Sequence, residues 1–514
     1  SNDQTLFFDK DENNVIRNEG YSVRPSAGFI GRINYNYADR YLLELSGRYD
    51  GSFIFPRNKR WGFFPSVSAG WRVSSEQFFA NSVLSNYISN LKFRVSYGEM
   101  GNDDNYSSNK VLGIGDWDYM YGYNMNAGTG VIASDPFISS SGSTIGSVSQ
   151  RGMPVTNLSW VKSSMLNIGV DLGFLNNRLT LEVDGFMRKR SGLTDRRGDV
   201  YIPYETGYSE MPLENLNTDK HIGIDGLIKW QDNVGREFYY SVGFNATLAR
   251  KKNGNVYGER FGNSWEQYRK SGQNRWSYVN WGYEVIGRFQ TQEEIDAYPV
   301  IMNISNGSDR NKLVLPGDLI YKDQNGDGVI NDYDSRPIGY AEGGLPYMTY
   351  GLNLACSYKG FDIAIDFAGA ALQSFQRNWE TKWPFQAGNT FNYMVEDRWH
   401  HEDPLDPSTP WVSGNYPALR PQSVNAWHVY CNNSTYWLTN AAYFRMKNLE
   451  IGYTIPQKIT QKIAMQKFRV FFNGTNLFSI DNTSKFGLDP ENSDTNGLGY
   501  PMVRVLTFGA TITF

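Results

Sequence analysis

Residues 348–367 read MTYGLNLACSYKGFDIAIDF, and their pattern decides the fold class. Every second residue from Met348 to Tyr358 is apolar or aromatic, and the residues between them are small or polar. After residues 359–360 the alternation resumes. Because successive side chains on a β-strand point to opposite faces, the pattern predicts an antiparallel hairpin with one apolar and one polar face. The apolar face would form a core in a soluble sandwich and would meet lipid in a membrane barrel, so one hairpin leaves both possibilities open.

The same alternation recurs along the chain in stretches that approach the length of a tilted membrane strand, about 10 residues. The final stretch ends on an aromatic residue, Phe514. Together these stretches give about 13 candidate strands. They lie at about 27–37, 41–49, 67–73, 91–97, 166–174, 179–183, 222–230, 238–248, 348–358, 361–367, 449–455, 468–472 and 506–514.

The connections between these strands alternate between short and long, and this alternation separates the two possibilities. Outer-membrane barrels have short periplasmic turns and long extracellular loops, whereas a soluble sandwich has no reason to place every long loop at one end. We therefore predict an all-β fold, a transmembrane antiparallel β-barrel. Its long extracellular loops are expected at about 51–63, 99–163, 189–219, 249–345, 373–442 and 478–503.

The number of strands suggests that residues 1–514 form the C-terminal part of a larger barrel. If the last strand ends in the periplasm, the odd count makes the first strand run in the same direction and places residues 1–25 outside the cell. An open edge would leave backbone groups unpaired in lipid. The chain begins at Ser1 with neither Met nor a signal peptide, which is consistent with processing or with a missing upstream piece.

Composition excludes several classes of protein. The chain has 514 residues, with 49 Lys and Arg against 53 Asp and Glu, so no basic excess is present and we expect no nucleic-acid partner. Two cysteines rule out a disulfide scaffold and thiolate metal clusters, and four histidines argue against a His-based zinc site. The mean hydropathy is −0.51. No apolar run reaches about 18 residues, which excludes a helical membrane protein.

Seven stretches of the sequence, spread along the chain, resemble in order the C-terminal barrel of SusC/RagA-type TonB-dependent transporters from Bacteroidetes outer membranes. One local departure occurs at Phe53-Ile54, where the family usually has Ser-Arg, and it affects loop contacts rather than the fold. The seven stretches are GRINYNYADRYLLELSGRYDGS (31–52), RWGFFPSVSAGWRVSSEQF (60–78), LKFRVSYGEMGND (91–103), GDLIYKDQNGDGVINDYDSRPIG (317–339), YGLNLACSYKGFDIAIDFAGA (350–370), RMKNLEIGYTIP (445–456) and YPMVRVLTFGATITF (500–514).

The resemblance implies a barrel of about 22 strands with an N-terminal plug domain. The plug and about nine of those strands would lie in an upstream segment, which would also contact the TonB complex. A SusD-like surface lipoprotein is implied as an extracellular lid. The resemblance also implies a multi-pass location in the outer membrane of a Gram-negative, Bacteroidetes-like cell.

Residues 323–334 read DQNGDGVINDYD, which matches the spacing of a calcium-binding EF-hand loop. Ca²⁺ prefers six to eight oxygen ligands, and this spacing points oxygens inward. No helical pattern flanks the segment, so it would be a structural calcium loop on a β-scaffold. The alternative is a rigid loop of Asx turns without a metal. The predicted ligands are Asp323, Asn325, Asp327, the Val329 carbonyl, Asn331 and Asp334.

No catalytic site is expected. The sequence contains no G-x-S-x-G, Walker A, H-E-x-x-H or dinucleotide-binding motif, so we predict neither an enzyme nor an organic cofactor. The run from His400 to Asp403 has the composition of a metal cluster. Adjacent histidines in an extended chain point in opposite directions, however, so a structural loop is favoured there.

Of the 14 tryptophans, ten in the long connections are candidates for a binding surface. Aromatic faces bind the C–H surface of sugars or anchor protein interfaces, and they also pack inside long loops. The group as a whole favours a substrate- or partner-binding surface, although internal packing is favoured for any single one. The ten are Trp117, Trp265, Trp276, Trp281, Trp379, Trp383, Trp399, Trp411, Trp427 and Trp437.

Several carboxylates fall on the polar register of the predicted strands and would face the barrel interior. A generic polar lining is favoured over a specific plug or substrate contact. Cys356 falls on the predicted lipid face and Cys431 in a loop, so no disulfide is expected between them. Tyrosines at strand ends are interpreted as an interfacial girdle. The carboxylates are Asp171, Glu182, Asp184, Asp225, Asp362, Asp366 and Glu450, and the tyrosines are Tyr35, Tyr37, Tyr41, Tyr358 and Tyr453.

The predicted function is TonB-dependent import of oligosaccharides, or of oligopeptides, together with a SusD-like lipoprotein. One alternative is an outer-membrane adhesin or structural surface protein that binds partners through its loops without transport; an upstream plug domain would distinguish the two. Another is a secreted all-β protein that binds or cleaves glycans, which a requirement for detergent would eliminate.

Overall fold

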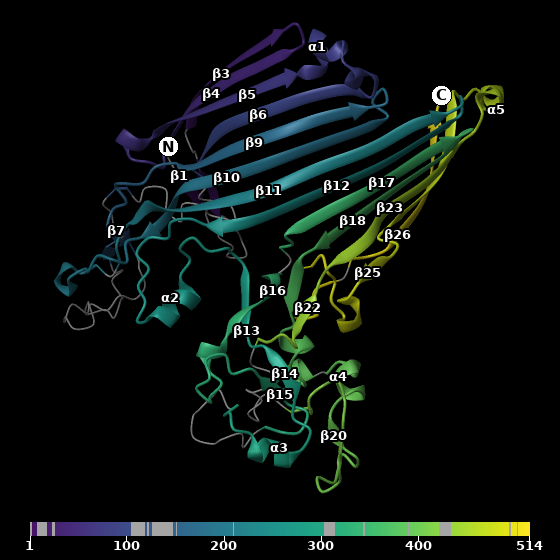
Figure 1. Ribbon diagram of the computed structural model, residues 1–514. Helices are drawn as coiled ribbons and strands as arrows, with labels where there is room; N and C mark the ends of the chain where they lie inside the picture. The colour runs from purple at the N-terminus through teal and green to yellow at the C-terminus, as the bar shows by residue number, and fades with distance from the viewer. Residues whose placement is uncertain are drawn as a thin grey trace. The chain divides into compact units, whose positions relative to one another are not determined.

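A computed structural model of the chain is shown in Figure 1. The residues that it describes are 3–7, 18–22, 26–103, 119–120, 123–125, 148–150, 152–208, 210–302, 314–342, 345–388, 390–420, 433–492, 495–500 and 502–514.

Long antiparallel strands dominate the fold, and their hydrogen-bonded order follows the chain: β26-β24-β23-β18-β17-β12-β11-β10-β9-β6-β5-β4-β3, with β25 also paired to β23. The predicted antiparallel sheet of about 13 strands is confirmed. The strands are β3 (Ser26–Tyr37), β4 (Tyr41–Ser52), β5 (Trp61–Arg72), β6 (Ile88–Asn102), β9 (Val161–Phe174), β10 (Leu179–Arg196), β11 (Leu213–Val234), β12 (Phe238–Asn253), β17 (Met348–Tyr358), β18 (Phe361–Ala371), β23 (Tyr443–Thr454), β24 (Lys467–Thr475), β25 (Ser479–Asp481) and β26 (Val505–Thr513).

Smaller elements lie in the connections. Within the described residues they form a four-stranded sheet in the order β13-β16-β19-β22, the pairs β7-β8, β14-β15 and β20-β21, and five short α-helices, and the pair β1-β2 precedes β3. No helix in the described part of the chain is long and apolar enough to cross a membrane. The bounds are β1 (Asp3–Phe7), β2 (Asn18–Ser22), β7 (Tyr123–Met125), β8 (Val148–Gln150), β13 (Val279–Gly282), β14 (Val285–Arg288), β15 (Leu319–Tyr321), β16 (Arg336–Glu342), β19 (Gln373–Gln376), β20 (His400–His401), β21 (Trp411–Val412), β22 (Leu438–Asn440), α1 (Gln77–Ala80), α2 (Ser264–Lys270), α3 (Gln292–Ala297), α4 (Asn392–Glu396) and α5 (Gln457–Thr460).

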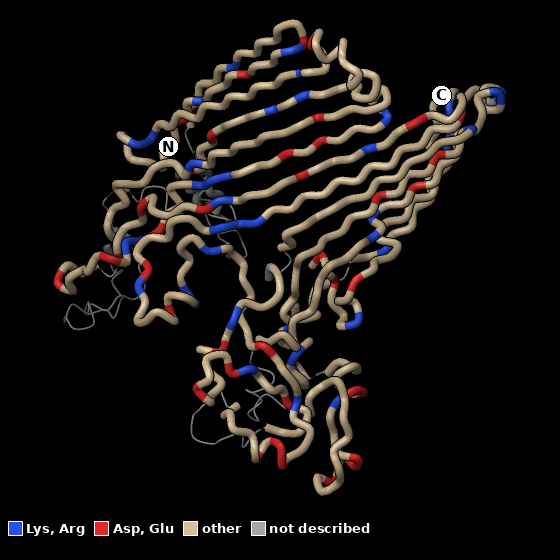
Figure 2. Tube along the Cα trace, viewed as in Figure 1, with Lys and Arg blue, Asp and Glu red and all other residues tan. Residues whose placement is uncertain are grey.

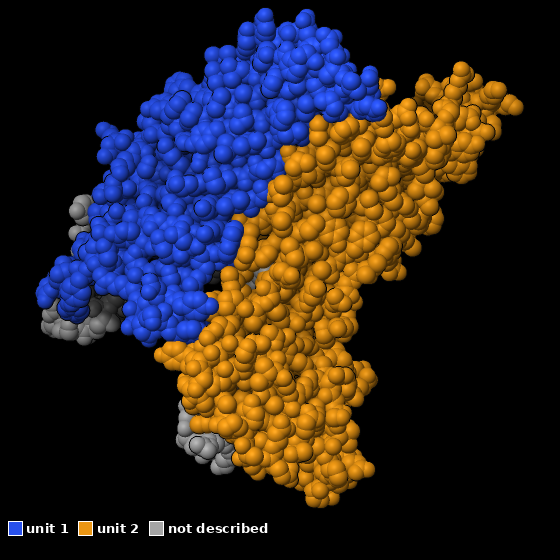
Figure 3. Space-filling view, viewed as in Figure 1, with its two compact units in different colours: residues 1–171, 184–223, 251–277 blue, residues 172–183, 224–250, 278–514 orange. Residues whose placement is uncertain are grey.

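The chain divides into two compact units, which Figure 3 colours separately. Unit 1 comprises residues 1–171, 184–223 and 251–277, and unit 2 comprises residues 172–183, 224–250 and 278–514.

In unit 1, the register of β3 to β6 stacks exposed apolar side chains in rows across the strands. Aromatic rows lie toward both ends of the strands, and the row between them is largely aliphatic. This arrangement of aromatic girdles around an aliphatic band is typical of a sheet that crosses a membrane. The rows are Tyr37-Tyr41-Trp71-Phe93, Ile33-Leu45-Val67-Tyr97 and Phe29-Tyr49-Phe63.

Unit 2 repeats the arrangement, and the hairpin predicted from residues 348–367 is confirmed as β17 and β18. Its turn places Lys359 and Gly360 at positive φ, 49° and 90°, as a two-residue hairpin turn requires. At Gly360 a Cβ atom would also lie 2.7 Å from the Thr454 carbonyl oxygen. The predicted apolar register is continuous through Tyr240-Cys356-Ile363-Ile451-Phe472-Phe508.

Some strands end later than the alternation indicates. β10 continues to Arg196 and β11 begins at Leu213, so residues 197–212 connect them, where the sequence suggested a connection of about 189–219. The hydrogen-bonded ladder extends past the apolar band, where side chains no longer need to alternate. Conversely, β5 ends at Arg72, and Val73, expected in the strand, begins a 3₁₀ turn.

We predict that the two faces respond differently to a buried charge. In Leu45→Arg the new guanidinium lies in the aliphatic row and should cost about 2–4 kcal/mol at the centre of a bilayer. Ser68→Arg is the matched control, because Ser68 is adjacent to Val67 in that row but lies on the polar face opposite Glu44. Folding yield and urea unfolding in lipid vesicles measure the difference, and equal tolerance of both variants would contradict the assignment of faces.

Candidate functional site

Charged residues of both signs lie along the strands (Figure 2), and many of those on the polar face are paired. In unit 1, Arg94 on β6 donates to Asp171 on β9 and to Asp184 on β10, each at 2.8 Å. Lys92 lies 3.9 Å from the same Asp171 carboxylate. These carboxylates were predicted on the polar register, and the structure places two of them around a single arginine.

A second network spans β18, β23 and β24 in unit 2. Arg469 donates to Asp362, at 3.1 Å from Nε, and to Glu450, at 2.6 Å from Nη2. Gly452 leaves room for this guanidinium, because a Cβ atom there would lie 2.3 Å from Arg469 Nη2. Asp366 accepts a hydrogen bond from Asn353 at 2.7 Å. Bridging arginines thus tie three strands together on the polar face.

Glu182 and Asp225 do not join these networks in any hydrogen bond or ion pair described here. Glu182 is exposed, and Asp225 is half-buried, with Oδ1 lacking a hydrogen-bond partner within the described part of the protein. The sequence analysis missed the arginines. The sequence contained a signal for them, because Arg94 lies on the polar register of its strand, between the apolar residues Phe93 and Val95.

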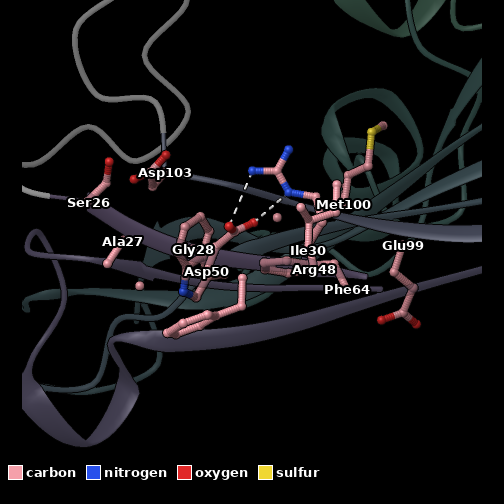
Figure 4. A pocket seen from close by; sticks show the side chains of 14 residues that line it. Ser26, Ala27, Gly28, Ile30, Arg48, Asp50, Phe64, Glu99, Met100 and Asp103 are labelled. Atoms are coloured by element: carbon pink, nitrogen blue, oxygen red, sulfur yellow. Dashed lines mark hydrogen bonds and ion pairs between the residues drawn. The ribbon is translucent and has the colours of Figure 1, made fainter. Parts of the chain in front are cut away.

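A pocket of about 630 Å³ opens on the polar face of unit 1, beside the edge of β3 (Figure 4). Arg48 and Asp50 form a two-pronged ion pair within it, with N···O distances of 3.0 and 3.2 Å. Glu99 and Asp103 add acidic groups to its lining. The charged groups of the pocket are therefore mostly acidic, and apolar side chains such as Phe64 and Trp160 line the rest.

Phe53 and Ile54, where the sequence differs from the usual family pattern, belong to a small apolar core in unit 1. Phe53, Ile54 and Phe55 are buried against Leu158 and its neighbours Val155 and Val161. These residues fasten the connection between β4 and β5 to the segment that precedes β9.

In unit 2, the described parts of residues 279–342 and 373–440 pack around a common core, which we call the loop core. Its fully buried members come from both connections. Asp318 from the first connection pairs with Arg420 from the second at 2.5 Å, and both are buried. The described parts of the two longest predicted loops that lie in unit 2 therefore share one core. The loop core comprises Tyr283, Phe289, Ile295, Met302, Val314, Leu319, Ile320, Tyr321, Ile330, Met394, Tyr416 and Trp437.

Arg377 is a second buried charge beside this core. Its guanidinium lies 4.8 Å from the ring centroid of Trp437 and 4.3 Å from that of Phe486. It donates to the Tyr416 hydroxyl and to the Tyr436 carbonyl oxygen. Burial raises the pKa of Tyr416, so its phenol stays neutral next to the arginine. Aromatic faces and neutral oxygens thus hold this cation.

The predicted calcium loop, residues 323–334, lies between β15 and β16 and is closed by its own hydrogen bonds. Asp323 accepts from the Gly326 and Gly328 amides at 2.7 and 2.8 Å. Asp334 is fully buried and accepts from the Gln324 and Asn331 amides, both at 2.8 Å.

The other predicted ligands also form hydrogen bonds within this loop. Asp327 accepts from the Val329 amide at 2.9 Å, and the Asn325 and Asn331 side chains donate to its second oxygen at 2.9 and 3.4 Å. Burial raises the pKa of Asp334, and the charges of Asp323 and Asp327 add to the increase. Within the described ranges no group of three or more His, Cys, Asp or Glu has metal-binding geometry. The oxygen donor set nevertheless fits a hard cation, because it combines three carboxylates, two amides and a carbonyl.

The histidine pair at 400–401 has a structural role in β20. His401 stacks on Trp411 with ring centroids 4.1 Å apart, and its Nδ1 lies 2.6 Å from the Thr409 carbonyl oxygen. His400 Nδ1 lies 2.6 Å from the His401 carbonyl oxygen. The two rings bind separate backbone groups, as expected for a loop.

The predicted tryptophans differ in accessibility. Trp399 and Trp437 are buried and cannot meet a ligand in this conformation. Trp276 and Trp379 expose 37% and 45% of their surface. Four others are half-buried: Trp265, Trp281, Trp383 and Trp411. Trp117 and Trp427, like Cys431, lie outside the described residues.

No family model matches the sequence. Relatives do: a TonB-dependent receptor, P26, of Formosa agariphila is 28% identical over the whole chain, which covers 49% of that receptor. SusC of Bacteroides thetaiotaomicron, also a TonB-dependent receptor, is 26% identical over 96% of the chain and 44% of its own length. The chain is thus similar to SusC-type TonB-dependent receptors, as the sequence analysis predicted. It spans about half the length of the curated relatives it matches.

Solved structures agree on the fold of this SusC/RagA-type chain. The RagAB peptide transporter superimposes with a TM-score of 0.65 at 20% identity, over 98% of the chain and 49% of that structure's chain. RagAB in its closed-closed state gives a TM-score of 0.67. The predicted outer-membrane location is confirmed by these relatives. These relatives are receptors and transporters, which agrees with the prediction that the protein is not an enzyme.

We predict that the buried Asp318–Arg420 pair holds the loop core together. Arg420→Met leaves the Asp318 carboxylate buried without its partner and should destabilise the loop core by about 3–5 kcal/mol. The double variant Asp318→Asn/Arg420→Met should recover most of that loss, because no charge remains. Rates of limited proteolysis within residues 279–342 and 373–440 measure the effect. Unchanged proteolysis in the single variant would contradict the prediction.

Proposed function

We propose that this chain supplies the C-terminal wall and the long loops of a TonB-dependent importer in the outer membrane. The observation that carries the proposal is the two-faced sheet. Its exposed apolar face fits lipid, and the face behind it is polar with many of its charges paired. The similarity of the chain to TonB-dependent receptors supports the same conclusion.

The polar face suits hydrated solutes. Arg94 and Arg469 are each bound to two carboxylates, so much of their charge is cancelled inside the wall. A large neutral oligomer could pass such a surface by exchanging hydrogen bonds, without being trapped by an unpaired charge.

For the substrate we propose an oligosaccharide, with an oligopeptide as the alternative. Trp276 and Trp379 are partly exposed, and indole rings pack well against sugar C–H groups. The peptide alternative has support in the RagAB structures, which are described as a peptide transporter.

We also propose two partners. Within the described part of the sheet, β3 and β26 are the terminal strands, each with one hydrogen-bonded neighbour. Backbone groups in lipid need partners, so an upstream segment with a plug and the remaining strands is expected to pair with both edges. That segment would contact the TonB complex. A SusD-like lipoprotein would cover the loops, consistent with the relatives of the chain.

Uptake in cells tests the proposal. The full-length protein should import an oligosaccharide only when TonB is present and should copurify with a lipoprotein in mild detergent. Trp276→Ala/Trp379→Ala should reduce uptake several-fold, since it removes the two partly exposed indole rings. Tyr204→Ala is the control, because this aromatic residue is also exposed but lies on the connection between β10 and β11. Binding without TonB-dependent uptake would instead identify an adhesin.

We further propose that residues 323–334 bind Ca²⁺ as a structural ion. Asp323, Asn325, Asp327, Val329, Asn331 and Asp334 would supply the oxygens. The adjoining Ile330 is fully buried in the loop core, so the loop is anchored to a packed scaffold. Bound calcium would neutralise the carboxylates and stiffen the loop.

Calcium should raise the melting temperature of the loop core relative to a chelator, and Asp327→Asn should remove this shift. Asp332→Asn is the matched control, since Asp332 lies in the same loop but outside the ligand set. Ca²⁺ binds the ionised carboxylate, so affinity should fall as pH drops through the raised pKa of Asp334. Calorimetry of both variants measures the shift, and an identical response of the two would contradict the site.

A further inference from the structure

The connection between β5 and β6, residues 73–87, folds into short helical turns with two distinct faces. Its inner face is fixed to the sheet by Glu76, a buried carboxylate. Glu76 accepts hydrogen bonds from Trp71 Nε1 at 3.2 Å and from Arg40 Nη1 at 3.4 Å, and it also bonds the Tyr41 hydroxyl. Val73 and Phe79 are buried beside it.

The outer face is apolar and exposed. Phe78, Val83, Leu84 and Tyr87 expose 62%, 74%, 56% and 63% of their surface. Glu76 is the only charged residue in the segment, and it belongs to the inner face. A patch of four large apolar side chains without a charge is unusual for a surface in contact with water.

The anchoring contacts locate this patch. Trp71 and Tyr41 are neighbours in the aromatic row of the exposed apolar face of unit 1, which faces lipid. Because Glu76 binds both of them, the segment lies beside the girdle and the patch continues the apolar surface past it. The two-residue turn at Ala38-Asp39, which ends the neighbouring strand, has no comparable extension.

We propose that residues 73–87 form an interfacial membrane anchor. Phe78, Val83, Leu84 and Tyr87 enter the boundary between the headgroups and acyl chains of the leaflet at this end of the strands. The occupant is phospholipid. An uncharged patch with aromatic and aliphatic side chains fits that boundary, and the contacts of Glu76 with Trp71 and Tyr41 make the patch continuous with the aromatic row of the apolar face. The anchor does not depend on the proposed import, since it acts on lipid alone.

Spin labelling tests the anchor in the full-length protein reconstituted in phosphatidylethanolamine/phosphatidylglycerol vesicles without partner proteins. A nitroxide is placed at Leu84→Cys in a background of Cys356→Ser and Cys431→Ser. Val67→Cys, in the aliphatic row, is the lipid reference, and Leu405→Cys, at a position 92% exposed between β20 and β21, is the water reference. Collision rates with oxygen and with a water-soluble nickel chelate are measured at each site.

The label at position 84 should collide with oxygen several-fold more often than with the nickel chelate, as at position 67 and unlike at position 405. Nickel accessibility equal to that at position 405 would overturn the proposal, because the patch would then lie in water. Low accessibility to both reagents would also overturn it, since protein would cover the patch. If Leu84→Cys does not fold, Val83→Cys provides the same test on the same face.

Discussion

The structure depends on one constraint: backbone N–H and C=O groups in lipid must find partners within the protein. The antiparallel ladder from β3 to β26 provides these partners strand by strand. Once the ladder exists, its register is no longer free, because a slip of one residue would turn every apolar side chain to the polar face. The tight turns at residues 38–39 and 359–360 fix that register through positive φ angles. Periodicity, turn geometry and membrane placement therefore follow from the same requirement.

The polar face is the second consequence of that register. Alternation places acidic and basic side chains there regardless of pairing, and adjacent strands bring them within reach of one another. Arg94 and Arg469 each join side chains from three strands, so the charge pairs also link the ladder laterally. The planar guanidinium, with five donors, can serve two carboxylates at once, which a single ammonium group does less well. The wall of the proposed transport pathway is consequently polar, and its charge pairs link neighbouring strands.

The sequence predicted the strands well because their information is local. Met348–Phe367 specifies its own hairpin, and the apolar register across unit 2 follows from repeating the same pattern. The ends of β10 and β11 could not be predicted, because hydrogen bonding continues where the apolar alternation stops. The loop core was missed for a different reason. Its contacts join residues such as Asp318 and Arg420, which are about a hundred positions apart and carry no periodic signal.

The high aromatic content of the chain has two separate physical origins. On the strands, Tyr41 and Trp71 are exposed because a membrane interface accepts a ring with a polar atom. In the loop core, Trp437 and Tyr416 are buried because long connections need large side chains to build a core of their own. The same residue types thus suit two environments, the membrane interface on the strands and the protein interior in the loop core. Aromatic enrichment alone could not separate a binding surface from a packed interior, whereas burial does, and it leaves Trp276 and Trp379 as the predicted loop tryptophans with the largest described exposure.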